Sequence, residues 1–239
     1  MDLQGVRVAV LGGTSGIGRA TAALLADQGA DVVVAGRSED KVAQTVAALP
    51  AVRGEQVDAT DRGQLDALFD RLGEIDHLVV CVSGGAGAGP FAALDLTELR
   101  RAFAAKTFAQ LEAVQAALSH LRRAGSVTLV TAASAQAAFP GTAGLAAVNG
   151  ALEAAVRPLA AELAPLRVNA VSPGVVDTPW WNSWPDADRA AFFAQASQQL
   201  PAGRTGHPDD IAAAIALLIG NGFITGHVLV VDGGAHLAR

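Results

Sequence analysis

The chain has 239 residues, a length that fits one large α/β domain or two small ones. Hydrophobic residues make up 51% of the sequence and charged residues 17%, so the chain has enough apolar surface for an extensive core and is not a disordered chain. The formal net charge of −6 provides no basic field for nucleic acid or an anionic membrane.

The sequence carries no sign of export or membrane insertion. The single cysteine, Cys81, has no second cysteine to pair with, and residues 1–5 lack the basic and apolar regions of a secretion signal. The apolar runs fall short of the roughly 18 residues of a membrane span, and the alanine-rich stretches 142–164 and 211–219 are typical of buried helices. We therefore expect a cytoplasmic, soluble protein without a membrane partner.

Short β-branched runs alternate with longer helical patterns along the chain. The runs predict strands at 6–11, 31–35, 52–57, 77–82, 126–131, 168–171 and 227–231. The helical patterns lie near 17–28, 39–49, 61–72, 97–123, 143–163 and 208–219. Most of the runs are apolar on both faces, as in parallel strands that helices cover from both sides. The alternation predicts a doubly wound, Rossmann-type parallel sheet of about seven strands, in a single domain over residues 1–239.

Residues 175–207 interrupt this rhythm. The segment is rich in Trp, Pro and Gln and holds all three tryptophans, with Phe192 and Phe193 following them. It is too long for an ordinary connection between a strand and a helix, which favours a functional role.

The first predicted strand runs into a glycine-rich loop that a helix follows. The loop reads Gly12-Gly13-Thr14-Ser15-Gly16-Ile17-Gly18. Glycine lets the backbone turn tightly and approach a pyrophosphate, which the free N–H groups of the helix N-terminus then bind. Because strand, glycine loop and helix come in this order, the loop predicts a dinucleotide-binding site.

These motifs resemble those of the short-chain dehydrogenase/reductase family over essentially the whole chain. Gly12, Gly16 and Gly18 match the family's TGxxxGxG loop, with Leu11 in place of its threonine. Asp58 matches the acidic residue that meets the adenine ring. The later matches are the RVNAVSPG stretch at 167–174, Thr178 near the nicotinamide, and the C-terminal stretches 203–211, 224–226 and 231–234.

The resemblance implies a nicotinamide cofactor lying across the carboxyl ends of the strands. Besides the residues of the glycine loop, the contacts it implies are Arg37, Ser38, Asp58, Ala59, Cys81, Val82, Ser83, Asn149, Pro173, Gly174, Val176 and Thr178. Cys81 is also typical of a small buried hydrophobic residue. The histidines have no metal-ligand spacing, so no metal site is implied.

The end of the second predicted strand favours NADP(H), with NAD(H) possible. A carboxylate there would bind the ribose 2′-hydroxyl of NAD, but Gly36 stands at this point. Arg37 offers a guanidinium that matches a 2′-phosphate, and Ser38 adds a donor. The alternative is that Arg37 is a solvated arginine at a strand end.

The catalytic positions of the family are altered. The family uses a tyrosine as general acid and base, with a lysine, a serine and an asparagine in support, but this chain contains no tyrosine. Aligned through the flanking motifs, Leu145 stands at the tyrosine position and Asn149 at the lysine position. Ala132 takes the serine position and Lys106 the asparagine position.

Three residues are candidates to replace the lost chemistry: Lys106, Ser134 and Asn149. A lysine in an apolar pocket has a lowered pKa and can donate a proton to a developing oxyanion. The alternatives are that Lys106 is an exposed helix residue or an interface contact, and that Ser134 is a loop or capping serine.

The combined features predict an NADP(H)-dependent reductase of a carbonyl, imine or activated alkene. The resemblance makes residues 175–207 a substrate lid, and its aromatic residues favour a large apolar or aromatic substrate. Packing in the core or at a subunit interface is the alternative. Two other functions stay open: a nucleotide-binding scaffold or sensor without catalysis, and a non-redox dehydratase or cyclase. The resemblance and the small side chains of helix 145–163 also predict a homo-oligomer, a tetramer or dimer, although Pro158 departs from good helix chemistry.

Overall fold

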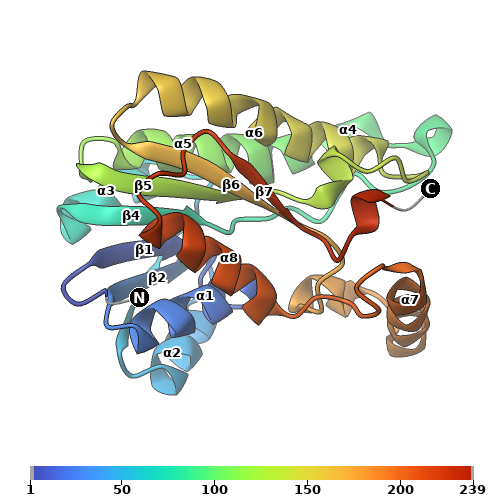
Figure 1. Ribbon diagram of the computed structural model, residues 1–239, viewed down its shortest axis with the longest axis horizontal. Coiled ribbons are helices and arrows are strands. Elements are labelled where there is room, and N and C mark those ends of the chain that lie inside the picture. The colour runs from blue at the N-terminus through green and yellow to red at the C-terminus, as the bar shows by residue number, and fades with distance from the viewer. Residues whose placement is uncertain (1–2, 238–239) are drawn as a thin grey trace.

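The computed structural model describes residues 3–237 and contains one seven-stranded sheet (Figure 1). The strand order is β3-β2-β1-β4-β5-β6-β7, and each of the six pairings is parallel. The strands are β1 (Arg7–Leu11), β2 (Asp31–Gly36), β3 (Val52–Gln56), β4 (Ile75–Val80), β5 (Leu121–Val130), β6 (Arg167–Pro173) and β7 (Val228–Val231). The predicted fold class is confirmed.

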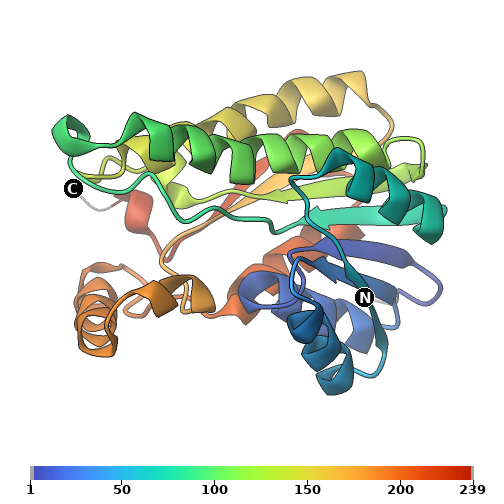
Figure 2. The ribbon, with the colours of Figure 1, turned by 180° about the vertical axis from the view of Figure 1, so that it is seen from behind.

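Helices cover both faces of the sheet (Figure 1). They are α1 (Gly16–Asp27), α2 (Glu39–Ala48), α3 (Arg62–Leu72), α4 (Leu96–Ala102), α5 (Ala109–Ala117), α6 (Ala143–Glu162), α7 (Asp186–Gln199) and α8 (Pro208–Gly220). Helices α1, α2 and α8 lie on one side, and α3, α5 and α6 lie on the other, as the view from behind also shows (Figure 2). The central strands are therefore buried on both faces, as their apolar sequences predict.

Two apolar clusters hold the layers together. One joins β4 and β5 to α3, α5 and α6, with Leu68, Phe69 and Leu129 fully buried. The other joins β1 and β2 to α1 and α8 through Leu25 and Ile215. None of the helices within residues 3–237 is long and apolar enough to cross a membrane.

The helix predicted near 97–123 was wrong in its C-terminal part. The helix ends at Ala117, and β5 begins at Leu121 instead of 126. Leu121 pairs with Ile75 of β4, and the Ile75 N–H donates to the His120 carbonyl at 2.8 Å. Local sequence offers no glycine or proline before Gly125 to end the helix, so only pairing with β4 decides this boundary.

The long segment after β6 is also more regular than predicted. It contains a short 3₁₀ helix over Pro179–Ser183 and then helix α7. Helix α7 lies apart from the sheet and its flanking helices in both views (Figures 1 and 2), and none of its residues is buried. Without a buried face, its sequence lacks the strong apolar periodicity that reveals the other helices.

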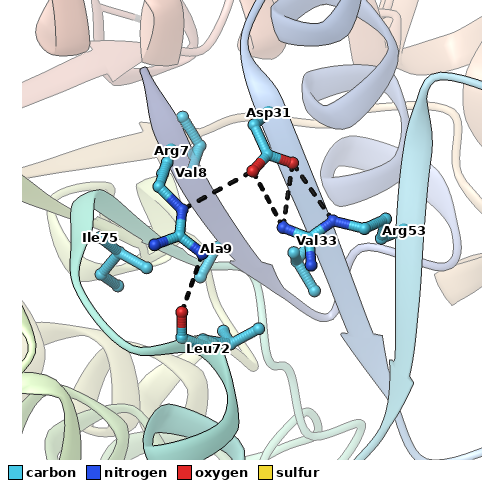
Figure 3. Close-up of a pocket in the computed structure, with 8 residues that line it drawn as sticks. All are labelled: Arg7, Val8, Ala9, Asp31, Val33, Arg53, Leu72 and Ile75. Atoms are coloured by element: carbon cyan, nitrogen blue, oxygen red, sulfur yellow. Dashed lines mark hydrogen bonds and ion pairs between the residues drawn. The ribbon is translucent and has the colours of Figure 1, made fainter. Parts of the chain in front are cut away.

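The amino ends of β1, β2 and β3 carry an ion-pair cluster around a small hollow (Figure 3). Asp31 lies between Arg7 and Arg53, with a closest contact of 2.9 Å to Arg53, and Arg7 also donates to the Leu72 carbonyl. The cluster links strand and helix ends at the edge opposite the glycine loop. We therefore assign it a structural role.

Candidate functional site

The glycine loop is shaped by close backbone packing. Gly12 has φ = 74°, and its N–H donates to the Ala35 carbonyl at 2.8 Å. A Cβ on Gly18 would lie 2.2 Å from the Gly12 oxygen, so a side chain at Gly18 is sterically excluded. Gly16, with φ = 49°, opens α1 and faces Thr178, whose Cβ would lie 3.2 Å from an added methyl. The loop thus joins β1, α1 and the segment after β6.

The N-terminus of α1 suits an anionic ligand. Its N-cap, Ser15, makes no side-chain capping bond. The first N–H groups of a helix lack partners within the helix, and together with the helix dipole they favour a phosphate. The predicted loop residues, Thr14, Ser15 and Ile17 among them, thus lie where a pyrophosphate would bind. This geometry fits a dinucleotide.

An exposed arginine follows β2, next to the glycine that contacts this loop. Arg37 is exposed, and its backbone carbonyl accepts a hydrogen bond from Gln56 at 3.1 Å. A Cβ on Gly36 would lie 2.8 Å from Thr14 Cγ2, so a side chain at position 36 would clash with Thr14. Ser38 is the N-cap of α2, because its hydroxyl oxygen accepts from the Lys41 N–H. Its hydroxyl proton stays available to a ligand.

Asp58 begins a tight turn after β3. Its carboxylate accepts from the Thr60 N–H at 3.0 Å and from the Thr60 hydroxyl at 2.8 Å. The backbone hydrogen bond from Thr60, together with its hydroxyl and the nearby Arg37, lowers the pKa of Asp58 below its usual value, against the effect of burial. Ala59 is buried beside it. The carboxylate is therefore ionised and fixed in place.

Gln110 ties the carboxyl ends of β4 and β5 together. This fully buried side chain of α5 donates from Nε2 to the Val82 carbonyl at 2.9 Å and to the Val130 carbonyl at 3.0 Å. Ser83, next along the chain, is exposed. Burial raises the pKa of the Cys81 thiol to about 12, so Cys81 stays neutral and is no reactive thiolate.

Lys106 is buried at the carboxyl end of β5. It belongs to a π-helical segment, Phe103–Phe108, between α4 and α5, and is only 6% exposed. Its Nζ donates to the Thr131 carbonyl at 3.1 Å, just after β5. Burial lowers the pKa of Lys106 to about 8, although the nearby Cys81 and Glu153 oppose the shift. The alternative of an exposed helix residue is therefore wrong.

Asn149 and Ser134 lie in contact. Asn149 is 3% exposed on α6, and its Nδ2 donates to the Leu145 carbonyl at 2.8 Å and to the Ser134 hydroxyl at 3.4 Å. Ser134 is half-buried in a short 3₁₀ helix, Ala133–Ala135. Both residues were predicted from the sequence as candidates, but their contact was not predicted.

The loop after β4 packs against the start of α6. The Leu145 N–H donates to the Gly87 carbonyl at 3.1 Å, and the Gly89 N–H donates to the Gly141 carbonyl. A Cβ on Gly144 would lie 2.5 Å from the Gly87 oxygen, and this clash is avoided only with glycine at position 144. The backbone of this loop therefore lies directly against Leu145.

Glu153 is a polar residue of this edge that the sequence reasoning missed. Its carboxylate accepts hydrogen bonds from Thr131, Ser172 and Gln136. Leu145, Asn149 and Glu153 are four residues apart on α6 and so share one face of the helix. This four-residue spacing could have identified Glu153 from the sequence.

The aromatic residues after β6 form one cluster. The Trp181 ring lies 4.6 Å from the Trp180 ring and 4.9 Å from the Phe192 ring, between centroids. Trp184 and Phe193 complete it. Trp180 Nε1 donates to the Gly84 carbonyl at 3.5 Å, and Trp181 Nε1 to the buried Val176 at 2.9 Å. The cluster thus contacts the loop that follows β4.

The backbone of residues 173–178 is held from two sides. The Gly174 N–H donates to the Val231 carbonyl at 3.0 Å, and a Cβ on Gly174 would lie 2.6 Å from Asp232 Cα. Pro173 closes β6, and Val176 forms an isolated parallel bridge with Gly206. These contacts place Thr178 against the glycine loop.

Comparison with known proteins decides the family. The family model described as enoyl-(acyl carrier protein) reductase matches residues 12–236. The chain belongs to the short-chain dehydrogenase/reductase family. It is 34% identical to a cis-4-hydroxycyclohexanecarboxylate dehydrogenase of Sinomonas cyclohexanicum, over 95% of this chain and 96% of the relative.

Other members of the family are similarly close. A 1-cyclohexenylcarbonyl-CoA reductase of Streptomyces collinus is 32% identical, over 94% of this chain and 85% of the relative. A small-chain dehydrogenase solved in complex with NADPH is also 32% identical and superposes with a TM-score of 0.86, covering 98% of this chain and 99% of the other.

The glycine loop generates a first prediction. We expect Gly18→Ala to destabilise the protein by about 1–3 kcal/mol, because its methyl would overlap the Gly12 carbonyl. Gly150→Ala is the matched control. A Cβ there meets nothing within 4 Å inside α6, so we expect a gain of about 0.5–1 kcal/mol. Urea unfolding of both variants measures the difference. Equal effects in the two variants would contradict the packing described.

Proposed function

We propose that the protein is an NADP(H)-dependent oxidoreductase that reduces a carbonyl, imine or activated alkene of an apolar or aromatic substrate. The observation that carries this proposal is the buried Lys106 ammonium at the carboxyl end of β5, on the same edge of the sheet as the glycine loop. An ionisable group in such a site is a candidate for catalysis.

The cofactor side of the proposal rests on three features. The glycine loop and the uncapped start of α1 would hold the pyrophosphate. Arg37 and the Ser38 hydroxyl would bind a 2′-phosphate, and Asp58 the adenine end. Thr178 would meet the nicotinamide end. The NADPH complex of a structural relative supports this assignment. When bound, the reduced nicotinamide supplies a hydride.

The proton side rests on Ser134, Asn149 and Lys106. The Ser134 oxygen accepts from Asn149, which leaves the hydroxyl proton of Ser134 free to donate to a substrate oxygen. Lys106 lies deeper and provides the positive charge that a developing oxyanion requires, and the proton that finally neutralises it. In this proposal the three residues replace the tyrosine that the chain lacks.

The substrate class is proposed from the aromatic cluster. Residues 175–207 would cover the substrate, with Trp180 and Trp184 partly exposed on the cluster. Large aromatic side chains favour apolar rings. The two relatives named above act on six-membered carbocyclic compounds, according to their names, and one of them is a reductase. A cyclic carbonyl or enone is the first compound to test.

The missing tyrosine favours a second candidate function, a nucleotide-binding scaffold or sensor. A non-redox dehydratase or cyclase would also use the site at the carboxyl ends of the strands. An assay in two steps distinguishes these functions. NADPH binding is first titrated by fluorescence, and loss of NADPH absorbance is then followed with carbonyls, imines and enones. Binding without consumption across the panel would favour the scaffold.

We expect Arg37→Asp to weaken NADPH binding by about 10–100-fold, because a charge-assisted bond to the 2′-phosphate contributes about 1.5–3 kcal/mol. NADH binding should change much less. Arg123→Asp, an exposed arginine on β5, is the charge-matched control. Fluorescence titration with both cofactors measures the effect. Equal losses for NADH and NADPH would refute the role of Arg37.

We expect Lys106→Met to reduce kcat by about 10²-fold or more while NADPH affinity and folding are kept. The wild-type reduction rate should fall as pH rises through about 8, because Lys106 loses its proton there. The reduction rate of the variant should not fall in this pH range. Lys41→Met removes the other lysine, which is exposed, and serves as control. An unchanged kcat would show that Lys106 is not the proton donor, and that the proton comes from water, Ser134 or the substrate.

We also propose a homo-oligomer in which α5 and α6 pack against a second copy. A groove between these helices is lined by Phe108, Leu118, Leu159 and other residues, and Phe108 is 56% exposed. We expect a dimer or tetramer mass from light scattering at micromolar concentration. Phe108→Glu should shift that mass toward the monomer, because a charge would be buried at the contact. A monomeric wild type would refute this proposal.

A further inference from the structure

The Glu153 carboxylate joins four parts of the carboxyl edge. Its Oε1 accepts from the Thr131 hydroxyl at 2.8 Å and from the Ser172 hydroxyl at 2.7 Å. Its Oε2 accepts from Gln136 at 2.9 Å. These partners lie at the end of β5, in β6 and after the short 3₁₀ helix, while Glu153 itself lies on α6. Three donors on two oxygens suit an ionised carboxylate, which only accepts.

Thr131 connects this carboxylate to Lys106. Its hydroxyl donates to Glu153, and its carbonyl accepts from Lys106 Nζ at 3.1 Å. The same hydroxyl also reaches the Val171 carbonyl at 3.2 Å, so Thr131 is fixed from several sides and is 3% exposed. The position of Lys106 Nζ therefore depends on a residue that Glu153 holds.

Glu153 is also the negative charge that acts on Lys106. The ionisable groups that influence Lys106 are Cys81, after β4, and Glu153, on α6. The pKa of Cys81 is about 12 and that of Lys106 about 8, so the thiol is still neutral when the lysine titrates. Of the two groups that raise the pKa of Lys106, Glu153 is the one whose hydrogen bonds fit a negative charge.

We propose that Glu153 is a positioning residue for Lys106: it holds Thr131 and balances the charge of the buried ammonium, and so keeps Lys106 protonated and aimed at the Thr131 carbonyl. This inference rests on the proposed function only where it concerns the reaction. The charge balance itself is a property of the folded protein and is measured without a substrate.

The chain offers a direct measurement, because it contains only two lysines, Lys41 and Lys106. In protein labelled with ¹³C and ¹⁵N at lysine, the two side-chain signals are followed by NMR against pH. Lys41 is exposed and serves as an internal reference. Lys106→Met assigns the signals.

We expect Glu153→Gln to lower the titration midpoint of Lys106 by about one pH unit or more, because a nearby opposite charge is lost. The midpoint of Lys41 should stay unchanged. Glu162→Gln, which removes an exposed carboxylate from the same helix, is the matched control and should move neither signal. Glu153→Asp keeps the charge but is one methylene too short to hold Thr131 as Glu153 does, so the Lys106 midpoint should be intermediate. This variant decides the question if Glu153→Gln does not fold.

An unchanged Lys106 midpoint in a folded Glu153→Gln or Glu153→Asp protein would overturn the inference. The outcome is separate from that of the proposed function. If Lys106→Met is fully active while Glu153→Gln still lowers the midpoint, the charge balance holds and Lys106 is not the proton donor. In an active enzyme, the pH at which the rate falls should move down with the midpoint in Glu153→Gln.

Discussion

The carboxyl edge of the sheet is organised around the burial of one ammonium group. Removing a charge from water is costly unless a partner and hydrogen bonds compensate it. For Lys106 the compensation comes from the Thr131 carbonyl and from the carboxylate of Glu153 beyond it. The π-helical segment that carries Lys106 fits this picture, since such segments occur often at functional sites. Stability alone would be better served by an apolar residue there.

The two halves of the site differ in how they are built. The nucleotide half is made mainly of backbone, where Gly12 and Gly18 are fixed by contacts that exclude side chains. The proposed chemical half is made of side chains on different elements, and Lys106, Ser134, Asn149 and Glu153 come from three parts of the chain. Added side chains would clash with the backbone at Gly12 and Gly18, so the backbone half depends on glycine at these two positions.

The aromatic cluster connects the two halves. Trp180 reaches the Gly84 carbonyl after β4, while Thr178 at the start of the same segment lies against Gly16. This segment therefore contacts both the glycine loop and the loop that leads to Leu145. None of the residues of helix α7 is buried, and Phe192 and Phe193 join this helix to the cluster.

The sequence by itself determined the sheet, the glycine loop and Arg37 at the end of β2, because apolar periodicity and glycine placement act locally. It also located Lys106 and Asn149 through the flanking motifs. Only the tertiary structure decided that Lys106 is buried, that Asn149 meets Ser134, and that β5 begins at Leu121. It alone revealed the hydrogen-bond partners of Glu153, which lie up to 22 residues away in sequence. Burial, strand pairing and charge compensation depend on contacts between distant residues, which local patterns do not encode.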